Sequence, residues 1–257
     1  MPSHMSSIGF PTRKIEAFNY YLARTIEAGE TISTQSGFYI KWEVGNGVEL
    51  WVQANRDRQI IGLNPHFSGS ARMRVGLTAR ISRPESILDG AFRGWVDPPE
   101  TDNPEMVGRY PLVFDLPDYA LYSSLSLPTL VTLQLTAFAE ELKAFDTDQA
   151  YYDSWERERK FAAECFIPGE AFSQDGESTK QNPAHAFFSG HILAAERVTN
   201  QFTNYDFYWA KVRTYGGEVD VVADPELIEG SLIVGGVVSG TFWLSGRLQD
   251  TQCAIAP

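Results

Sequence analysis

The stretch FYIKWEVGNGVELWVQA at residues 38–54 resembles FYWAKVRTYGGEVDVVA at residues 207–223. Each stretch has two runs rich in aromatic and β-branched residues, joined by a glycine-containing turn, which is typical of a β-hairpin. A third run follows each pair, at residues 73–81 and 240–248, and the offsets stay close, 207 − 38 = 169 and 247 − 80 = 167. Two similarly ordered sets of strands predict two related β-modules.

Glycines at 235, 236, 240 and 246 interrupt the long apolar runs of the second module. Strands that bend at glycines suit small closed barrels, because such strands must coil and turn corners. We therefore expect a mainly β protein with two small OB-like antiparallel barrels, a possible internal duplication, an N-terminal helix and a loop-rich central section. The expected modules are residues 6–172 and 184–257, separated by a polar loop.

The N-terminal helix is predicted over residues 12–28, where Ile15, Phe18, Leu22 and Ile26 form one apolar stripe. The apolar residues of segment 129–145 fit both the two-residue period of a strand and the 3.6-residue period of a helix. Its threonine-rich start favours a strand, and its Glu-Glu-Leu-Lys end favours a helix. We predict a strand there. Seven prolines between residues 82 and 128 predict short strands joined by long loops.

The chain has 33 acidic and 21 basic residues, with a net charge of −12. Such a charge disfavours nucleic acid and anionic membranes, which bind through Lys and Arg. The N-terminus has no signal-peptide pattern, and Ser3-His4-Met5 resembles a cloning scar, so His4 is left out of the functional argument. With two cysteines and no apolar run long enough to span a bilayer, we expect a cytoplasmic protein; whether Cys165 and Cys253 pair stays open.

Carboxylates within apolar strands are the weak catalytic candidates, because burial would raise their pKa values and suit them to acid–base work. These candidates are Glu49, Glu164 and Asp220, and His66 is a further weak candidate. Each has an ordinary alternative: every second residue of a half-exposed strand is polar, and His66 after Asn64-Pro65 fits a turn. We find no nucleophile, Walker or dinucleotide motif and expect no cofactor.

Metal sites are also weakly indicated. His185 and His191 are six residues apart, roughly 20 Å along an extended strand at about 3.3 Å per residue, too far to share one ion. The acidic loop offers oxygen ligands for calcium at Asp97, Glu100 and Asp102, but it lacks the EF-hand pattern. We expect no metal.

The adjacent aromatic residues of the two modules cannot all point one way, because alternate residues of a strand face opposite sides. Ala210 and Val212 are in phase with Tyr208, which predicts that Tyr208 faces inward. The ligand-binding candidates on the opposite faces are therefore Tyr39, Phe207 and Trp209, while Trp42 is expected in the core.

Two functions fit this sequence best, and a third, a single-strand nucleic-acid binder, is suggested by the OB-like barrels but opposed by the charge. The first is a non-catalytic binding or protein-interaction module that uses exposed aromatic residues on its β-barrel faces, with a protein or a neutral small molecule as partner. The alternative is a small-molecule or carbohydrate-acting enzyme with a carboxylate acid–base pair in a barrel mouth or interdomain cleft. Whether the protein is an enzyme, and what its oligomeric state is, stay open.

Overall fold

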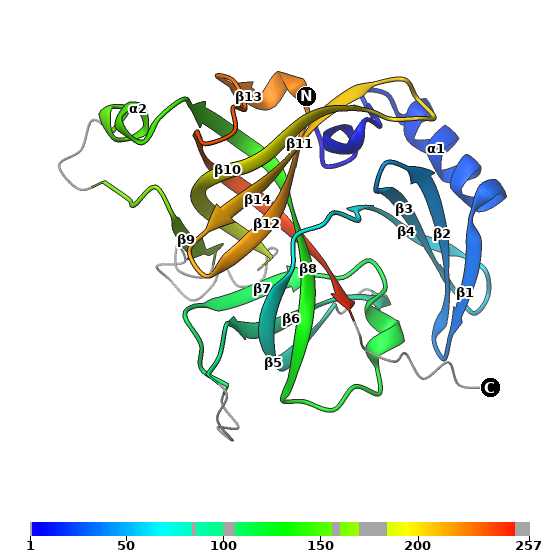
Figure 1. Ribbon diagram of the computed structural model, residues 1–257. Helices are drawn as coiled ribbons and strands as arrows, with labels where there is room; N and C mark the ends of the chain where they lie inside the picture. The colour runs from blue at the N-terminus through cyan, green and yellow to red at the C-terminus, as the bar shows by residue number, and fades with distance from the viewer. Residues whose placement is uncertain (1, 84–85, 100–105, 156–159, 170–183, 250–257) are drawn as a thin grey trace.

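The computed structural model describes residues 2–83, 86–99, 106–155, 160–169 and 184–249. The protein is mainly β, with 56% strand and 14% helix, and its strands form two sheets. A four-stranded sheet and helix α1 lie on one side of the molecule, and the larger sheet occupies the other side (Figure 1).

The smaller sheet has the order β1-β2-β3-β4 and is antiparallel throughout. Asn46 and Gly47 adopt positive φ angles of 52° and 79° in the turn between β2 and β3, as the Gly-Asn-Gly sequence predicts. Pro65 lies inside β4, an edge strand that pairs with β3 on one side, and edge strands are where a sheet tolerates proline. The elements are α1 (Ile15–Ala28), β1 (Glu30–Thr34), β2 (Gly37–Gly45), β3 (Val48–Asn55) and β4 (Ile60–Phe67).

The larger sheet closes on itself through its pairings. Strands β5 (Met73–Arg83), β6 (Ser86–Val96) and β7 (Pro111–Asp115) pair in order, and a short 3-10 helix, η2 (Tyr119–Tyr122), follows β7. Strand β7 meets β14 (Val237–Gln249), which pairs with β8 (Thr129–Phe145), and β8 returns to β5. These five strands form one ring.

A second ring of paired strands uses the other ends of β8 and β14. Strand β14 pairs with β10 (His185–Thr199), β10 with β11 (Asp206–Thr214), β11 with β12 (Gly217–Ala223), and β12 with β8. Gly240 lets β14 approach β8 closely, because a Cβ at this position would lie 2.0 Å from the carbonyl oxygen of Glu141. Smaller elements flank this ring: α2 (Asp148–Asp153), β9 (Cys165–Pro168), η5 (Pro225–Leu227) and β13 (Ile228–Glu229).

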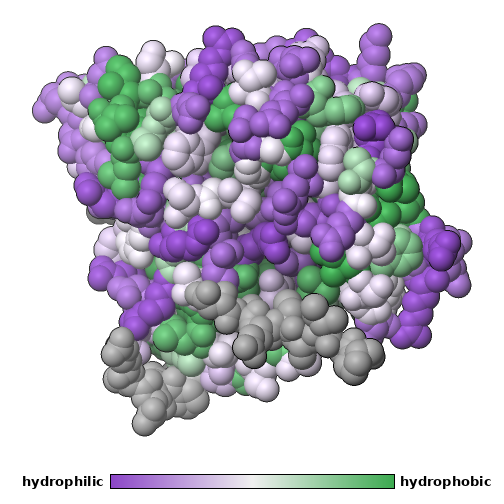
Figure 2. Space-filling view, turned by 45° about the vertical axis from the view of Figure 1, so that its right-hand side comes forward, coloured by the Kyte–Doolittle hydropathy of each residue, from purple (hydrophilic) through white to green (hydrophobic). Residues whose placement is uncertain are grey.

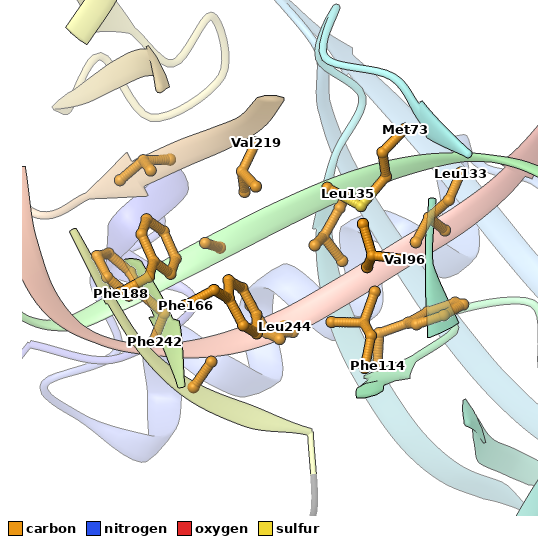
Figure 3. Close-up of a cluster of buried hydrophobic side chains, with 14 of the residues drawn as sticks. Met73, Val96, Phe114, Leu133, Leu135, Phe166, Phe188, Val219, Phe242 and Leu244 are labelled. Atoms are coloured by element: carbon orange, nitrogen blue, oxygen red, sulfur yellow. The ribbon is translucent and has the colours of Figure 1, made fainter. Parts of the chain in front are cut away.

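The main hydrophobic core fills the inside of both rings (Figure 3). The aromatic side chains of Phe188 and Phe242 stack with their centroids 4.0 Å apart, and Phe166 stacks on Phe188 with a centroid distance of 5.7 Å. Met73, Leu133 and their neighbours continue this core toward β5 and β7 (Figure 3). Side chains that point out of the rings, such as Ser245 and Gln134, therefore face away from the main core toward the smaller sheet.

The strand prediction for residues 129–145 is confirmed by β8, and the N-terminal helix by α1. The loop-rich centre is corrected: β6 is an eleven-residue strand whose Phe92 and Val96 pack in the main core, while its Leu88 packs against the smaller sheet. Strands β11, β12 and β14 also lie close to their expected positions.

The internal duplication is not confirmed. Hairpin β2–β3 lies in the smaller sheet beside β4, whereas hairpin β11–β12 lies in the second ring between β10 and β8. Strand β8, from the first expected module, pairs with β14, from the second, over 13 positions from Thr132 to Phe145, with one bulge in between.

The N-terminal segment is an integral part of the fold. Residues Ser6–Ile8 form a 3-10 helix, η1, against β11 and β12, and Ile8 and Phe10 are fully buried. Hydrophilic residues cover most of the face shown in Figure 2, with smaller hydrophobic areas between them. Within the described residues, no helix is both long and apolar enough to cross a membrane.

Candidate functional site

A polar interface separates the smaller sheet from the outer face of the rings. Register places Glu49 and His66 opposite each other on β3 and β4, with Lys41 and Trp51 on the same face of this sheet. From the rings, β8 and β14 supply the facing polar side chains. The buried polar residues of this interface are Glu49, His66, Gln134, Thr136 and Ser245.

A chain of hydrogen bonds crosses the interface. The Nδ1 atom of His66 lies 2.9 Å from the Oγ of Ser245, and its Nε2 lies 3.1 Å from the Oε1 of Gln134. The amide of Gln134 donates to Asp220 at 3.0 Å and to Thr136 at 2.8 Å. Asp220 also accepts from the backbone N–H groups of residues 70 and 71 and from the indole N–H of Trp209. The chain of hydrogen bonds therefore ends at the Asp220 carboxylate, whose two oxygens together accept four hydrogen bonds.

Glu49 sits in a cluster of cations beside this chain. Lys41 Nζ lies 3.0 Å and Arg247 Nη1 lies 3.5 Å from its carboxylate, and the indole of Trp51 donates to it at 2.9 Å. Burial opposes the charge, but His66, Arg247 and Lys41 together hold the pKa of Glu49 below its usual value. Burial lowers the pKa of His66 to about 4, so its imidazole is neutral at pH 7.

A cavity of about 520 Å³ opens at the edge of this interface. Strand β4 forms one wall with Asn64 and Pro65, and β14 forms the opposite wall with Trp243 and Ser245. Its charged residues come from three consecutive strands of the first ring: Arg83 from β5, Asp89 from β6 and Asp115 from β7.

Asp89 and Asp115 form a carboxyl pair in this cavity. Ala91 is the register partner of Asp115, and Asp89 lies two residues before it, so both carboxyls share one face of the sheet. Arg83 binds Asp115 at 2.5 Å and lies 3.9 Å from Asp89. Burial raises the pKa of both carboxyl groups, and the Asp115 charge raises that of Asp89 further.

The two carboxyls differ in how they are held. Asp115 is bound through both oxygens, because the indole N–H of Trp243 donates to Oδ2 at 2.7 Å while Arg83 holds Oδ1. The side chain of Asp89 is 35% exposed, against 12% for Asp115. Asp89 is therefore the carboxyl that a molecule in the cavity can reach.

His4, which the functional argument from sequence left out, also lines this cavity. Its ring stacks on Trp243 with centroids 4.6 Å apart, and its Nε2 lies 3.4 Å from Glu140. His185 binds the same carboxylate at 3.0 Å. Hydrogen bonds from His185 and His4 lower the pKa of Glu140 to about 2.

Two of the three aromatic candidates are buried, which corrects the expected exposed face. Tyr39 is fully buried, because β6 and η2 cover this face of the smaller sheet, and its hydroxyl donates to Leu88 O at 2.6 Å. Phe207 is fully buried because Phe67 and the N-terminal segment cover it. Trp209 is half-buried and lines a surface hollow between β11 and the segment after β4.

The expected core aromatics are corrected as well. Trp42 and Tyr208 are half-buried, as Trp209 is, instead of fully buried. Ala210 and Val212, in phase with Tyr208, do face the interior of the ring as expected.

Of the four catalytic candidates, three lie in the polar interface. Glu49, His66 and Asp220 are brought together there, and His66 is a buried strand residue instead of a turn residue. Glu164 lies elsewhere, just before β9, with its carboxylate 2.8 Å from both His191 and Arg213.

The metal candidates do not assemble into a site. Asp97 forms ion pairs with Arg74 and Arg109, while Glu100 and Asp102 lie outside the described residues. His185 and His191 bind different carboxylates. In the described parts of the chain, no three His, Cys, Asp or Glu side chains are grouped so that they could hold a metal ion. Cys165 is a free thiol, and Cys253 lies outside the described residues.

Sequence reasoning missed Asp89, Asp115 and Ser245. Asp89 precedes Gly90 in a segment that was expected to be loop, and Asp115 ends a short apolar run before Leu116-Pro117. A carboxylate at the end of an apolar run is a weak signal, because such positions are usually solvated. Only the folding of β5, β6, β7 and β14 around one cavity brings these residues together.

Known proteins give no direct guide to this site. No protein-family model matches the chain, and neither the curated proteins nor the solved structures include a significant match.

Proposed function

We propose that the protein is an enzyme that binds a neutral, hydroxyl-rich small molecule in the cavity between the sheets and acts on it through Asp89 as general acid and base. The observation that carries this proposal is the carboxyl pair: two neighbouring carboxyls with raised pKa values face a cavity that also contains a guanidinium group. Perturbed carboxyls in a concave site are a frequent feature of active sites.

The charge of the cavity supports a neutral ligand. The negative charge of Asp115 raises the pKa of Asp89, which favours a protonated Asp89 beside an ionised Asp115. Arg83 then balances the one remaining negative charge. Donors on Arg83 and Asn64 and acceptors on Asp89 suit hydroxyl groups, which both donate and accept hydrogen bonds.

The two carboxyls have separate roles in this proposal. Asp115, fixed by Arg83 and Trp243, supplies a negative charge that raises the pKa of Asp89. Asp89, the more exposed of the two, gives a proton to the substrate and takes it back. A general acid works best when its pKa lies near the working pH, so a raised pKa suits this role.

This proposal develops the enzyme alternative of the sequence analysis. The rival function, a non-catalytic module with an exposed aromatic face, loses two of its three named residues to the core. A neutral small molecule is a partner common to both hypotheses.

The test is ligand binding with and without the Asp89 carboxyl. A ligand that binds only the folded state raises the melting temperature, so monosaccharides, polyols and their esters are screened by thermal shift. We expect at least one of them to raise the melting temperature of the wild type and of the surface control Asp57→Asn, but to have a much smaller effect on Asp89→Asn. If no hydroxyl-rich compound shifts the wild type, or if Asp89→Asn responds equally, the proposed function is wrong.

A further inference from the structure

Ser245 and His66 form a second pair of reactive groups at the wall of the same cavity. Ser245 is among the lining residues of the cavity although its side chain is almost fully buried, and its Oγ lies 2.9 Å from Nδ1 of His66. The two residues are 179 positions apart in the chain, on β14 and β4. Hydroxyl and imidazole at hydrogen-bond distance, with the imidazole held by a third group, is the arrangement of an activated nucleophile.

The hydrogen-bond chain fixes which nitrogen of His66 carries the proton. Asp220 accepts four hydrogen bonds, so the group of Gln134 that faces it must be the NH₂. The hydroxyl of Thr136 donates to Phe67 O at 2.6 Å and so accepts the second N–H of Gln134. The Oε1 of Gln134 is then an acceptor, which requires a proton on Nε2 of His66.

The Nδ1 atom of His66 is consequently a lone pair directed at the Ser245 hydroxyl, which must donate its proton to it. This is the tautomer that a general base needs. The pKa of about 4 keeps that lone pair free at neutral pH but makes His66 a weak base, and the nearby Glu49 carboxylate partly offsets this by favouring the imidazolium that proton transfer would create.

We propose that Ser245 is a nucleophile activated by His66, and that the substrate is an acyl ester of a hydroxyl-rich alcohol. Gln134 and Asp220 are positioning residues, since they act through His66 without reaching the cavity themselves. The proposal deepens the proposed function by naming its reaction, an acyl transfer, and it rests on that function for the identity of the alcohol.

In the first step, Ser245 Oγ bonds to the carbonyl carbon of the ester while its proton moves to Nδ1 of His66. The carbon–oxygen bond to the alcohol then breaks, and the leaving oxygen takes the proton of the Asp89 carboxyl. Water attacks the acyl-serine next, giving a proton to Asp89, and the released Ser245 oxygen recovers its own proton from His66. Ester and water are consumed, and acid and alcohol are formed.

Covalent labelling tests the nucleophile without the true substrate. Diisopropyl fluorophosphate forms a bond from phosphorus to an activated serine oxygen and releases fluoride, so the adduct is detected by intact mass and assigned by peptide mapping. We expect one adduct on Ser245 in the wild type and none on Ser245 in Ser245→Ala. Ser239→Ala is the matched control, because Ser239 is a buried serine of the same strand.

The role of His66 is tested by the rate of labelling in His66→Gln, with a thermal melt to establish that the variant is folded. We expect labelling at least roughly a hundredfold slower, as for the loss of a general base. If His66→Gln does not fold, the pH dependence of wild-type labelling replaces it, with a rate nearly constant from pH 8 to pH 5.5 expected and a fall centred near pH 6.5 contradicting the buried neutral base.

An unlabelled wild type, or labelling on another serine, overturns the inference. Either result leaves the proposed function standing if hydroxyl-rich compounds still bind in an Asp89-dependent way. Labelling of Ser245 with no such binding overturns the proposed function instead, and the nucleophile then acts on another class of ester.

Discussion

We expect acid to destabilise this protein through His66. The imidazole is fully buried and neutral, and its pKa falls from 6.5 to about 4 because burial disfavours the charged form. As the pH falls below 6.5, the unfolded chain binds a proton at this residue before the folded chain does. The contribution of His66 to stability is therefore complete above pH 6.5 and is lost as the pH falls toward 4.

The size of this effect follows from the shift of the pKa. One pKa unit corresponds to 1.36 kcal/mol, so a fall from 6.5 to about 4 predicts a loss of about 3 kcal/mol between pH 7 and pH 4. This is a large part of the 5–15 kcal/mol that stabilises a typical protein. The charged groups facing His66 are Glu49, Lys41 and Arg247. Because the pKa of Glu49 is lowered in the folded protein, the contribution of Glu49 to stability is also lost in acid.

Urea unfolding of the wild type and of His66→Gln at pH 7, 5.5 and 4 separates these contributions. The quantity of interest is the difference in the free energy of unfolding between them at each pH, which reports His66 together with its effect on the pKa of Glu49. We expect the wild type to lose about 3 kcal/mol more than the variant between pH 7 and pH 4. Parallel curves for the two proteins would refute the reasoning, because His66 would then titrate normally.

Three further predictions concern single contacts. Tyr39→Phe leaves Leu88 O and the Ala120 N–H without their buried partner, so we expect a loss of about 2–3 kcal/mol in urea unfolding, against almost none for the exposed Tyr20→Phe. Hydrogen bonds to Asp148 and Glu164 raise the pKa of His191 despite its partial burial. The contribution of His191 to stability is therefore complete below pH 6.5 and is lost as the pH rises through the raised pKa. In urea unfolding, the wild type should exceed His191→Gln in stability by more at pH 6 than at pH 9. Trp209→Phe removes the indole N–H that Asp220 accepts at 2.9 Å, and a cost of roughly 1–3 kcal/mol in chemical unfolding is expected; no measurable cost would show that this bond contributes nothing to the interface.

The sequence predicted the strands better than their partners. Period-two alternation placed the hairpin strands of both modules, and the threonine-rich start of residues 129–145 correctly favoured a strand. Pairing depends on contacts between distant segments, so it could not be read from periodicity. The similar order of runs in the two halves therefore suggested a duplication that the positions of β2–β3 and β11–β12 do not confirm.

In the smaller sheet, the burial of side chains does not follow the alternation of polar and apolar residues along the strands, for one physical reason. The face with Tyr39 and Lys41 looked solvent-exposed because its residues are polar or amphipathic. In the structure both faces of the smaller sheet are covered, one by α1 and the N-terminal segment and the other by β6, η2 and β14. A sheet covered on both faces gives no reliable polar-out signal.

The catalytic candidates show the same limit. Choosing carboxylates inside apolar strands selected Glu49 and Asp220, which lie in the buried polar network, and also Glu164, which lies elsewhere. His66, which was expected in a turn, joins this network as a strand residue. The rule could not find Ser245, since a serine carries no distinguishing signal in a strand. It also could not find Asp89, whose partner Asp115 is 26 residues away in the chain, 115 − 89 = 26.

The polar interface has a consequence for the cavity. Each buried polar group needs a partner, and here the partner of His66 on β4 is Gln134 on β8, while the partner of Glu49 on β3 is Arg247 on β14. A shift of the smaller sheet by one residue would leave His66 without Gln134, at a cost of about 1–3 kcal/mol, and would separate Glu49 from Arg247 while its bonds to Lys41 and Trp51 remained. An apolar interface would tolerate such a shift far better, because hydrophobic contacts are not directional. The polar chain therefore fixes the register in which β4 faces β14, and these are the two strands that hold Asn64 and Ser245 on opposite walls of the cavity.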